Sequence, residues 1–523
     1  MMRILNLGLL LITIAALGQQ PSLTPIESAI DVTIIPHEEH QTISGFGASD
    51  AWSIQFVGQY WPESKRNQIA DLLFSNQLDR NNNPIGIGLS QWRFNIGAGS
   101  RSQGEDSGIK DAWRRTESFL GDTGYNWNAQ NGQLWFLNAA KKRGVNQFIA
   151  FSNSPPITMT KNSKAYSDGG IQANIDRSKY MEYINFLTRV LEEVNTRHQI
   201  EFDYIAPFNE PQWDWKRNSG QEGSPWTNSD IKILTTLLDS MLTVKHSTTK
   251  IELAEAGQLN YLYDTDNKAE RGNQIQAFFN PQSQNYLGNL KRVAHKISGH
   301  SYYTTFDTNT LISTRSKLKN TLQTLASPPE FWMTEYCVLE NNKEIVGRGR
   351  DLGIDTALYV GRVIHTDLVL ADASAWQWWL AVSPYNYKDG LIYIDKNKNN
   401  GHVYESKLLW TLGHYSRFIK RGYKRIGLER SDQNTTKNNI KDVLISTYKA
   451  PTKDEYIAVF INQTTSPKAI KYNVLDKDGY AATIYQTSNS PNDNLSYKGT
   501  LTSNNSYQMP AKSIVTLVIN QHI

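Results

Sequence analysis

The feature that most constrains this chain is an alternation of short apolar runs with helical stretches between residues 41 and about 410. Runs of this length, rich in branched and aromatic residues, are typical of buried strands. Eight such runs occur, at residues 42–47, 85–97, 146–156, 202–210, 250–257, 294–303, 330–338 and 373–383. The pattern predicts eight strands, each followed by a helical or loop-rich connection.

The connections carry helical signals of their own. In the stretch 227–246, apolar residues recur at helical spacing, and Thr227 with Asp230 resembles a capping box. Eight such β–α units predict a (β/α)8 barrel, a TIM barrel in the α/β class. A doubly wound sheet is the alternative, but it usually has a Gly-rich phosphate turn after its first strand. The segment "GFGASD" at 45–50 does not match that GxGxxG pattern.

The character of the sequence changes after about residue 420. Alternating β-rich runs are separated there by Asn, Ser, Asp and Gly turns, which predicts an all-β sandwich fused to the barrel. The strand-like stretch 29–40 precedes the barrel and is expected to pair with that sandwich. We therefore expect an N-terminal sandwich segment at 19–40, a barrel at 41–415 and the C-terminal sandwich at 416–523.

The first 18 residues resemble a secretory signal peptide. Arg3 supplies the positive charge, residues 4–17 form a short apolar region, and Ala16-Leu17-Gly18 offers a small-x-small cleavage site. An uncleaved anchor is the alternative, although the apolar region is short for a membrane span. We expect an exported protein, extracellular, periplasmic or at the cell surface, without membrane insertion.

Charge and cysteine content limit the partners of the protein. The 54 Lys and Arg against 50 Asp and Glu give a net charge of +4 without a basic stripe, so we expect no nucleic-acid partner. The single Cys, Cys337, excludes an intrachain disulfide and a Cys-based metal cluster. "HEEH" at 37–40 does not match HExxH. We expect no metal, no cofactor and a monomer.

Two carboxylates occupy the positions where a barrel places its chemistry. Glu210 ends the fourth predicted strand in "FNEP", and Glu335 ends the seventh in "WMTEY". A helix cap or a surface ion pair is the alternative for Glu210, but Pro211 restricts its backbone and offers no N–H. Glycoside hydrolysis needs a carboxyl pair of this kind facing one sugar. Glu255, at the end of the fifth strand, is expected to be structural.

Several motifs resemble glycoside hydrolase family 30. These are "SGFGAS", "FNEPQWDW", "FWMTEY" and the run "LLWTLGHYSRFIKRGYKRIG" at 408–427, and the resemblance extends over nearly the whole mature chain. The resemblance implies a (β/α)8 barrel with a sandwich drawn from both chain ends. It also implies Glu210 as acid/base and Glu335 as nucleophile, with retention of configuration and no cofactor.

Given this resemblance, neighbouring polar residues acquire expected roles. Asn209 is expected to bind the 2-hydroxyl of the sugar, and Arg93 to keep the nucleophile ionised. His300 and Tyr302 are expected to face the barrel mouth, with Tyr302 orienting Glu335. Asn153 ends the third strand and is a further candidate. A turn residue, a plain ion pair and a satisfied structural histidine are the alternatives for Asn209, Arg93 and His300.

Tryptophan is abundant, with 14 in the chain, and flat rings at strand ends suit sugar faces. Trp52 and Trp213 are expected to line the sugar subsites. In the eighth strand, Trp376 and Trp378 share one face and Trp379 takes the other, and we predict that the first pair faces the substrate. Core packing is the alternative for at least one member of this set.

The Arg-rich stretch 86–120 resembles the galactanase branch of the family. It favours a polysaccharide partner, with β-1,6-linked galactan as the expected substrate and endo-β-1,6-galactanase as the expected activity. β-1,6-Glucanase or xylanase activity is the alternative. A non-catalytic surface glycan-binding protein on the same barrel is the alternative of another class, but such a protein typically lacks one carboxylate.

Overall fold

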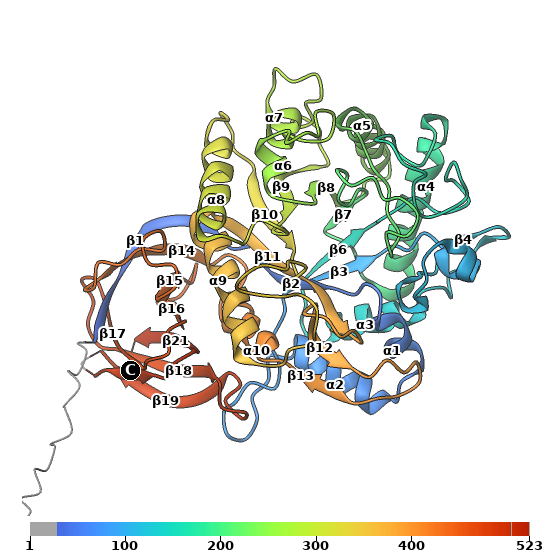
Figure 1. Cartoon of the computed structure of the whole chain (residues 1–523). Coiled ribbons are helices and arrows are strands. Elements are labelled where there is room, and N and C mark those ends of the chain that lie inside the picture. The colour runs from blue at the N-terminus through green and yellow to red at the C-terminus, as the bar shows by residue number, and fades with distance from the viewer. Residues whose placement is uncertain (1–28, 504, 522–523) are drawn as a thin grey trace, which may run out of the picture.

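The computed structural model describes residues 29–503 and 505–521, which form two packed parts (Figure 1). The expected signal peptide at 1–18 lies outside the described residues. The first part is a closed barrel of eight parallel strands in the order β10-β9-β8-β7-β6-β3-β2-β11, with β10 also paired to β11. These strands are β2 (Gly45–Ser49), β3 (Gln91–Asn95), β6 (Gln147–Phe151), β7 (Tyr204–Ala206), β8 (Lys250–Ala256), β9 (Val293–His300), β10 (Glu330–Glu335) and β11 (Ala373–Ser383). The predicted (β/α)8 barrel is confirmed.

Helices connect the barrel strands and cover them from outside (Figure 1). They are α1 (Ile54–Tyr60), α2 (Glu63–Phe74), α3 (Asn131–Lys142), α4 (Tyr180–His198), α5 (Asn228–Val244), α6 (Asn260–Tyr263), α7 (Gln274–Phe279), α8 (Thr308–Gln323), α9 (Ile354–Leu370) and α10 (Lys407–Ser416). Helix α5 shows why such a sequence folds locally. The side chain of Thr227 accepts a hydrogen bond from the backbone N–H of Asp230 at 3.1 Å, as the capping pattern predicted.

Short elements decorate the barrel. They are the 3₁₀ turns Ser100–Ser107, Ala112–Arg114 and Arg177–Lys179, and the hairpin of β4 (Leu120–Gly121) with β5 (Gly124–Tyr125). Beyond β11 the sheet continues with β12 (Gly390–Ile394) and β13 (Val403–Glu405). The segments after β3, β6 and β7 are long, so a large part of the chain lies over the carboxyl ends of these strands.

The second part is one nine-stranded sheet that contains β1 from before the barrel and eight strands from after it. The strands are β1 (Ile30–Thr42), β14 (Lys424–Arg430), β15 (Val443–Lys449), β16 (Glu455–Asn462), β17 (Lys468–Val474), β18 (Tyr480–Ser488), β19 (Ser496–Thr502), β20 (Tyr507–Met509) and β21 (Ser513–Gln521). Strand β1 pairs antiparallel with β14 and parallel with β17. The sheet folds over its own apolar core, which includes Val32, Phe460 and Leu517.

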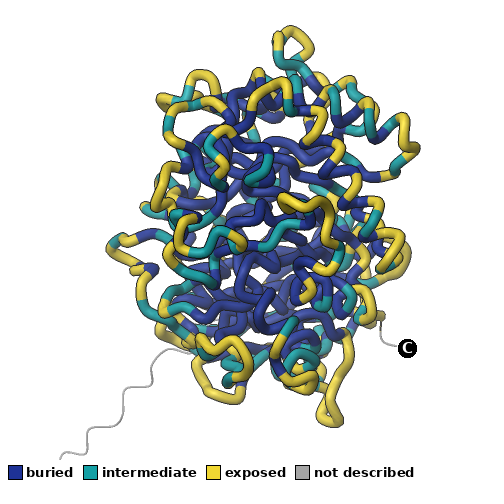
Figure 2. The backbone as a smooth tube through the Cα atoms, turned by 90° about the vertical axis from the view of Figure 1, so that its right-hand side faces the viewer, coloured by how far each residue is buried: buried dark blue, intermediate teal, exposed yellow. Residues whose placement is uncertain are grey.

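The two parts meet along helices α9 and α10, which lie between the barrel and the sandwich in Figure 1. His414 of α10 is fully buried, and its ring nitrogens lie 2.9 Å from the hydroxyls of Thr487 and Thr516 in the sandwich. Burial lowers the pKa of His414 to about 3, so it is a neutral hydrogen-bonding residue. Buried residues fill the interior, and exposed residues lie at the periphery (Figure 2). No helix in the described part of the chain combines the length and the hydropathy needed to cross a bilayer.

Candidate active site

The site lies at the carboxyl ends of β7 and β10, which are separated in the barrel by β8 and β9. Glu210 follows β7 and is 7% exposed, and Glu335 is the last residue of β10 and is 3% exposed. Both side chains line a cavity of about 710 Å³. The topology therefore brings together two acids that are far apart in the sequence, at the edge where barrels concentrate functional side chains.

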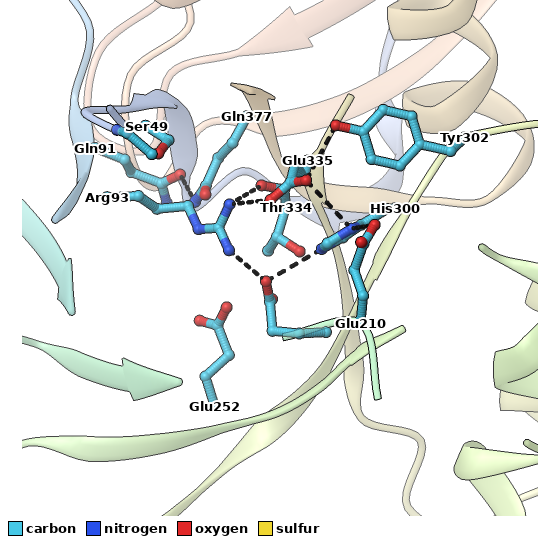
Figure 3. Close-up of polar contacts among 12 residues, drawn as sticks. Ser49, Gln91, Arg93, Glu210, Glu252, His300, Tyr302, Thr334, Glu335 and Gln377 are labelled. Atoms are coloured by element: carbon cyan, nitrogen blue, oxygen red, sulfur yellow. Dashed lines mark hydrogen bonds and ion pairs between the residues drawn. The ribbon is translucent and has the colours of Figure 1, made fainter. Parts of the chain in front are cut away.

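His300, at the end of β9, lies between the two carboxylates (Figure 3). Its Nδ1 is 3.0 Å from Glu210 Oε1 and 3.6 Å from Glu335 Oε1. One ligand atom from each of the three side chains lies within 4.8 Å of the others. Glu210 and Glu335 are thus close enough to contact the same group of a ligand.

Arg93 on β3 forms a buried ion pair with Glu335. Its Nη1 donates to Glu335 Oε2 at 2.9 Å and to the backbone oxygen of Thr334 at 3.2 Å. Tyr302 donates its hydroxyl to the other oxygen, Glu335 Oε1, at 3.0 Å. The guanidinium of Arg93 is fully buried and lies 4.2 Å from the ring centre of Phe151. Each oxygen of Glu335 therefore receives a hydrogen bond, which fixes the orientation of the carboxylate.

Glu255 is the residue of this site that the sequence reasoning missed. Its Oε2 accepts a hydrogen bond from Arg93 Nη2 at 2.5 Å and lies 3.2 Å from His300 Nε2. Its position near the carboxyl end of β8 was visible in the sequence, as that of Glu335 in β10 was, but this position did not reveal its partners. The expectation of a merely structural role for Glu255 is corrected, since its carboxylate contacts two residues of the candidate site.

The charges of this network set the protonation of its members. Burial raises the pKa of Glu210, the neighbouring His300 opposes this increase, and the charge of Glu335 adds to it. Burial disfavours the charge of His300, but the carboxylates of Glu335, Glu210 and Glu255 outweigh burial and raise its pKa to about 10. Although burial opposes it, the guanidinium of Arg93 and His300 keep the pKa of Glu255 low. The site thus places an acid of raised pKa, Glu210, beside a His300 whose pKa favours its charged form, a pattern typical of acid/base chemistry.

Two buried asparagine side chains follow barrel strands β7 and β6, and neither is among the residues that line the cavity. Asn209 and Asn153 are each 1% exposed and follow β7 and β6. Within the described part of the protein, neither amide group has a hydrogen-bond partner. Buried amides usually have partners.

Aromatic residues form much of the cavity wall, but not the set predicted from the eighth strand. Trp52, Trp213 and Trp379 line the cavity. Trp376 and Trp378 are 0% exposed, and their indole N–H groups donate to Asp367 Oδ2 at 2.9 Å and to the backbone oxygen of Asp389 at 2.8 Å.

The prediction that Trp376 and Trp378 contact the sugar is therefore wrong, while Trp52 and Trp213 lie where it placed them. The reason is the direction of the strand pleat. Gln377 points into the barrel, where its amide donates to Gln91 of β3 at 2.8 Å. Its even-numbered neighbours therefore point out of the barrel, Trp376 toward α9 and Trp378 toward the segment before β12, and Trp379 points to the cavity.

Glu210, His300 and Glu335 together resemble a metal-ligand set in composition. Their ligand atoms are already engaged by one another and by cations, since Arg93 lies 2.9 Å from Glu335 Oε2. Both ring nitrogens of His300 face carboxylates, and its raised pKa favours the imidazolium, which cannot bind a metal. The donor set fits a hydrogen-bonded acid–base network better than a cation site.

Comparison with models of known protein families identifies the family of this chain. Residues 29–393 match the model of O-glycosyl hydrolase family 30. The chain belongs to this family. It is therefore a glycoside hydrolase, and the non-catalytic alternative weighed from the sequence does not hold. The family assignment also agrees with the barrel and the β-rich domain described above.

The chain is also similar to individual proteins and to solved structures. An endo-β-1,6-galactanase of Hypocrea rufa is 25% identical over 411 residues, 75% of each chain. A glucuronoxylanase of Bacillus subtilis is 27% identical over 195 residues, 37% of this chain and 40% of its own. The structure of a conserved exported protein from Bacteroides fragilis superposes with a TM-score of 0.87 at 33% identity, covering 94% of this chain and 100% of that chain. A family 30 xylanase C from Talaromyces cellulolyticus has the same fold, with a TM-score of 0.66, 20% identity and coverage of 94% and 99%.

Proposed function

We propose that this family 30 enzyme is a retaining endo-β-1,6-galactanase with Glu210 as acid/base and Glu335 as nucleophile. The observation that carries the mechanism is the approach of the two carboxyls, with one oxygen of each within 4.8 Å. Retaining glycosidases separate their carboxyls by about 5–5.5 Å, whereas inverting enzymes need about 6.5–9.5 Å to admit a water molecule. The separation here supports retention.

The first step forms a covalent intermediate. Glu210, whose pKa is raised by burial, donates its proton to the glycosidic oxygen while Glu335 attacks the anomeric carbon from the other face. The bond from that carbon to the leaving sugar breaks, and an ester bond to Glu335 forms. Arg93 and Tyr302 hold the carboxylate of Glu335 in position for this attack.

The second step reverses the roles. Glu210, now ionised, takes a proton from water, and the resulting oxygen nucleophile attacks the anomeric carbon and releases Glu335 as a carboxylate. The ring of His300 contacts Glu210 Oε1 at 3.0 Å, so its N–H stabilises the ionised form that this step requires. Asn209 and Asn153 are proposed to bind sugar hydroxyls, and Trp52, Trp213 and Trp379 to pack against the sugar rings.

The substrate proposal is supported by the similarity to the Hypocrea rufa galactanase, which extends over 75% of both chains. A panel of purified β-1,6-galactan, β-1,6-glucan and glucuronoxylan, with product sizing, tests it. We expect β-1,6-galactan to yield short oligosaccharides, with the β-anomer formed first in proton NMR of the products. Preferred cleavage of glucan or xylan would refute the substrate, and an initial α-anomer would refute retention. Glu335→Gln is the matched control and should abolish turnover.

Export is also proposed. The N-terminal 18 residues resemble a signal peptide, and the similar Bacteroides fragilis protein is described as exported. Sequencing the N-terminus of the protein recovered outside the cytoplasm should show a chain that begins after Gly18. An N-terminus at Met1 in the cytoplasmic fraction would refute the proposal.

A further inference from the structure

The buried acid Glu222 lies outside the catalytic network and has no role in the mechanism above. It belongs to the segment between β7 and α5 and is fully buried. Its Oε2 accepts the backbone N–H of Ala98 at 2.9 Å, and its Oε1 accepts the backbone N–H of Ser100 at 3.0 Å. Burial raises the pKa of Glu222, and the donors that oppose this increase are those of Ala98, Ser100 and Thr116, without a cation among them.

Burying an acid whose hydrogen-bond donors are all neutral costs free energy of folding. The contacts that Glu222 makes therefore indicate its role. Ala98, Ser100 and Thr116 belong to the long segment that follows β3. Glu222 belongs to the segment that carries the acid/base Glu210. The two oxygens of Glu222 therefore join the connection after β3 to the connection after β7.

The neighbours of Glu222 extend this junction to a third connection. Gly223 donates its backbone N–H to Ala165 O at 2.8 Å, and Asn174 donates its backbone N–H to Ser224 Oγ at 3.0 Å. Ala165 and Asn174 lie in the segment after β6. Since β7, β6 and β3 are neighbours in the barrel, three adjacent loops are fastened to one another at residues 222–224.

This junction also reaches the acid/base. A Cβ on Gly223 would lie 2.2 Å from Trp215 Cδ2, so the indole ring lies directly on this glycine. The same indole donates its Nε1–H to the backbone oxygen of Glu210 at 3.1 Å. Glu210 and Trp215 have φ values of 46° and 45°. Side chains rarely adopt this left-handed region, and such residues persist only where surrounding contacts hold them.

We propose that Glu222 is a positioning residue that locks the loops after β3 and β7 into one wall of the catalytic cavity and, through Gly223 and Trp215, fixes the backbone of Glu210. The role of Glu210 as acid/base rests on the proposed function. Ser219 and Gln221, which directly precede the junction, and Trp215 line the same cavity. Loss of the Glu222 contacts therefore changes the site where the leaving sugar is protonated.

Glu222→Gln tests the proposal. The carboxylate accepts one backbone N–H on each oxygen, whereas the amide keeps only one acceptor oxygen, so one of the two hydrogen bonds is lost. Hydrogen bonds to charged groups contribute about 1.5–3 kcal/mol, so amide exchange at Ala98 and Ser100 should accelerate about tenfold to a hundredfold. Unchanged exchange at these two amides would overturn the proposal. Glu182→Gln, the same change on the exposed face of α4, is the matched control and should leave exchange at both amides unchanged.

Leaving-group dependence separates positioning of Glu210 from a general loss of structure. On β-1,6-galactan, kcat of Glu222→Gln should fall about tenfold or more, because general acid catalysis is sensitive to small displacements. On the dinitrophenyl β-glycoside of galactobiose, whose leaving group needs no proton, the rate of glycosyl-enzyme formation should change less than about twofold. Equal losses on both substrates would overturn the positioning of Glu210.

A second variant keeps the test decisive if Glu222→Gln fails to fold. Trp215→Phe retains a ring against Gly223 but removes the donor to the backbone oxygen of Glu210. Trp215→Phe should show the same leaving-group dependence as Glu222→Gln. If Trp215→Phe slows both substrates equally, or neither, the link to Glu210 is overturned. If the wild type cleaves neither substrate, the proposed function fails, while amide exchange still decides whether Glu222 fastens the loops.

Discussion

Replacement of Glu255 by Gln removes a charge that two buried cations share. Each pKa unit corresponds to about 1.36 kcal/mol, so a His300 pKa of about 10, against the ordinary 6.5, corresponds to roughly 5 kcal/mol. Glu255 is one of three carboxylates that raise this pKa. Its share is therefore about 2 kcal/mol if the three contribute equally. Arg93 also loses a partner, and truncating one side of a buried pair costs about 3–5 kcal/mol. We expect a destabilisation of about 3 kcal/mol at neutral pH.

The pH dependence gives the sharper test. His300 has a higher pKa in the folded protein than in the unfolded chain, so its charge stabilises the fold fully below pH 6.5, and this contribution is lost as the pH rises to about 10. Glu255→Gln lowers the folded-state pKa of His300 and shortens this window. The difference in free energy of unfolding between the wild type and Glu255→Gln should therefore narrow as the pH rises from about 7 to about 10.

Urea denaturation followed by tryptophan fluorescence across this pH range measures the difference, with Glu182→Gln as the exposed control. The expected control curve parallels the wild type. A difference between the wild type and Glu255→Gln that stays constant from neutral to alkaline pH would refute the argument that Glu255 maintains a charged His300. A variant as stable as the wild type at neutral pH would refute the shared ion pair.

Three further substitutions distinguish residues that affect catalysis or substrate binding from residues that affect stability. Tyr302→Phe removes the 3.0 Å hydrogen bond to Glu335, and kcat/KM should fall about tenfold or more with little change in stability, as measured by initial rates and thermal unfolding. Trp379→Ala removes a ring from the cavity wall and should raise KM for the polymer, whereas unchanged KM would place the sugar elsewhere. Trp376→Phe leaves Asp367 without its 2.9 Å donor and should cost about 1–3 kcal/mol of stability while kcat per folded molecule is kept.

Much of the architecture follows from local pattern. Apolar runs alternating with helical repeats predict the barrel, and the β-rich ends predict the sandwich with a strand contributed from before the barrel. The same pattern placed Glu210 and Glu335 at strand ends. Parallel strands in a barrel end at one rim, so two acids 125 positions apart in the chain had to lie near the same opening.

The sequence pattern does not determine which face of β11 points into the barrel. A period of two divides β11 into two sets of side chains, but it does not say which set points inward. Gln377 meets Gln91 inside the barrel, so Trp376 and Trp378 point out of the barrel. That choice depends on the register of β11 against its neighbours, which is a property of the closed barrel and not of the strand alone.

Pairings across the barrel are likewise decided by tertiary structure. A carboxylate at a strand end has the same sequence signature whether it meets an arginine, a histidine or solvent, so Glu255 was not distinguishable before its partners were in place. Glu222 lies in a loop without a motif and contacts backbone N–H groups more than 120 positions away. Backbone donors carry no sequence signal. The sequence by itself determined where the reactive acids could be, and only the folded chain decided which groups hold them there.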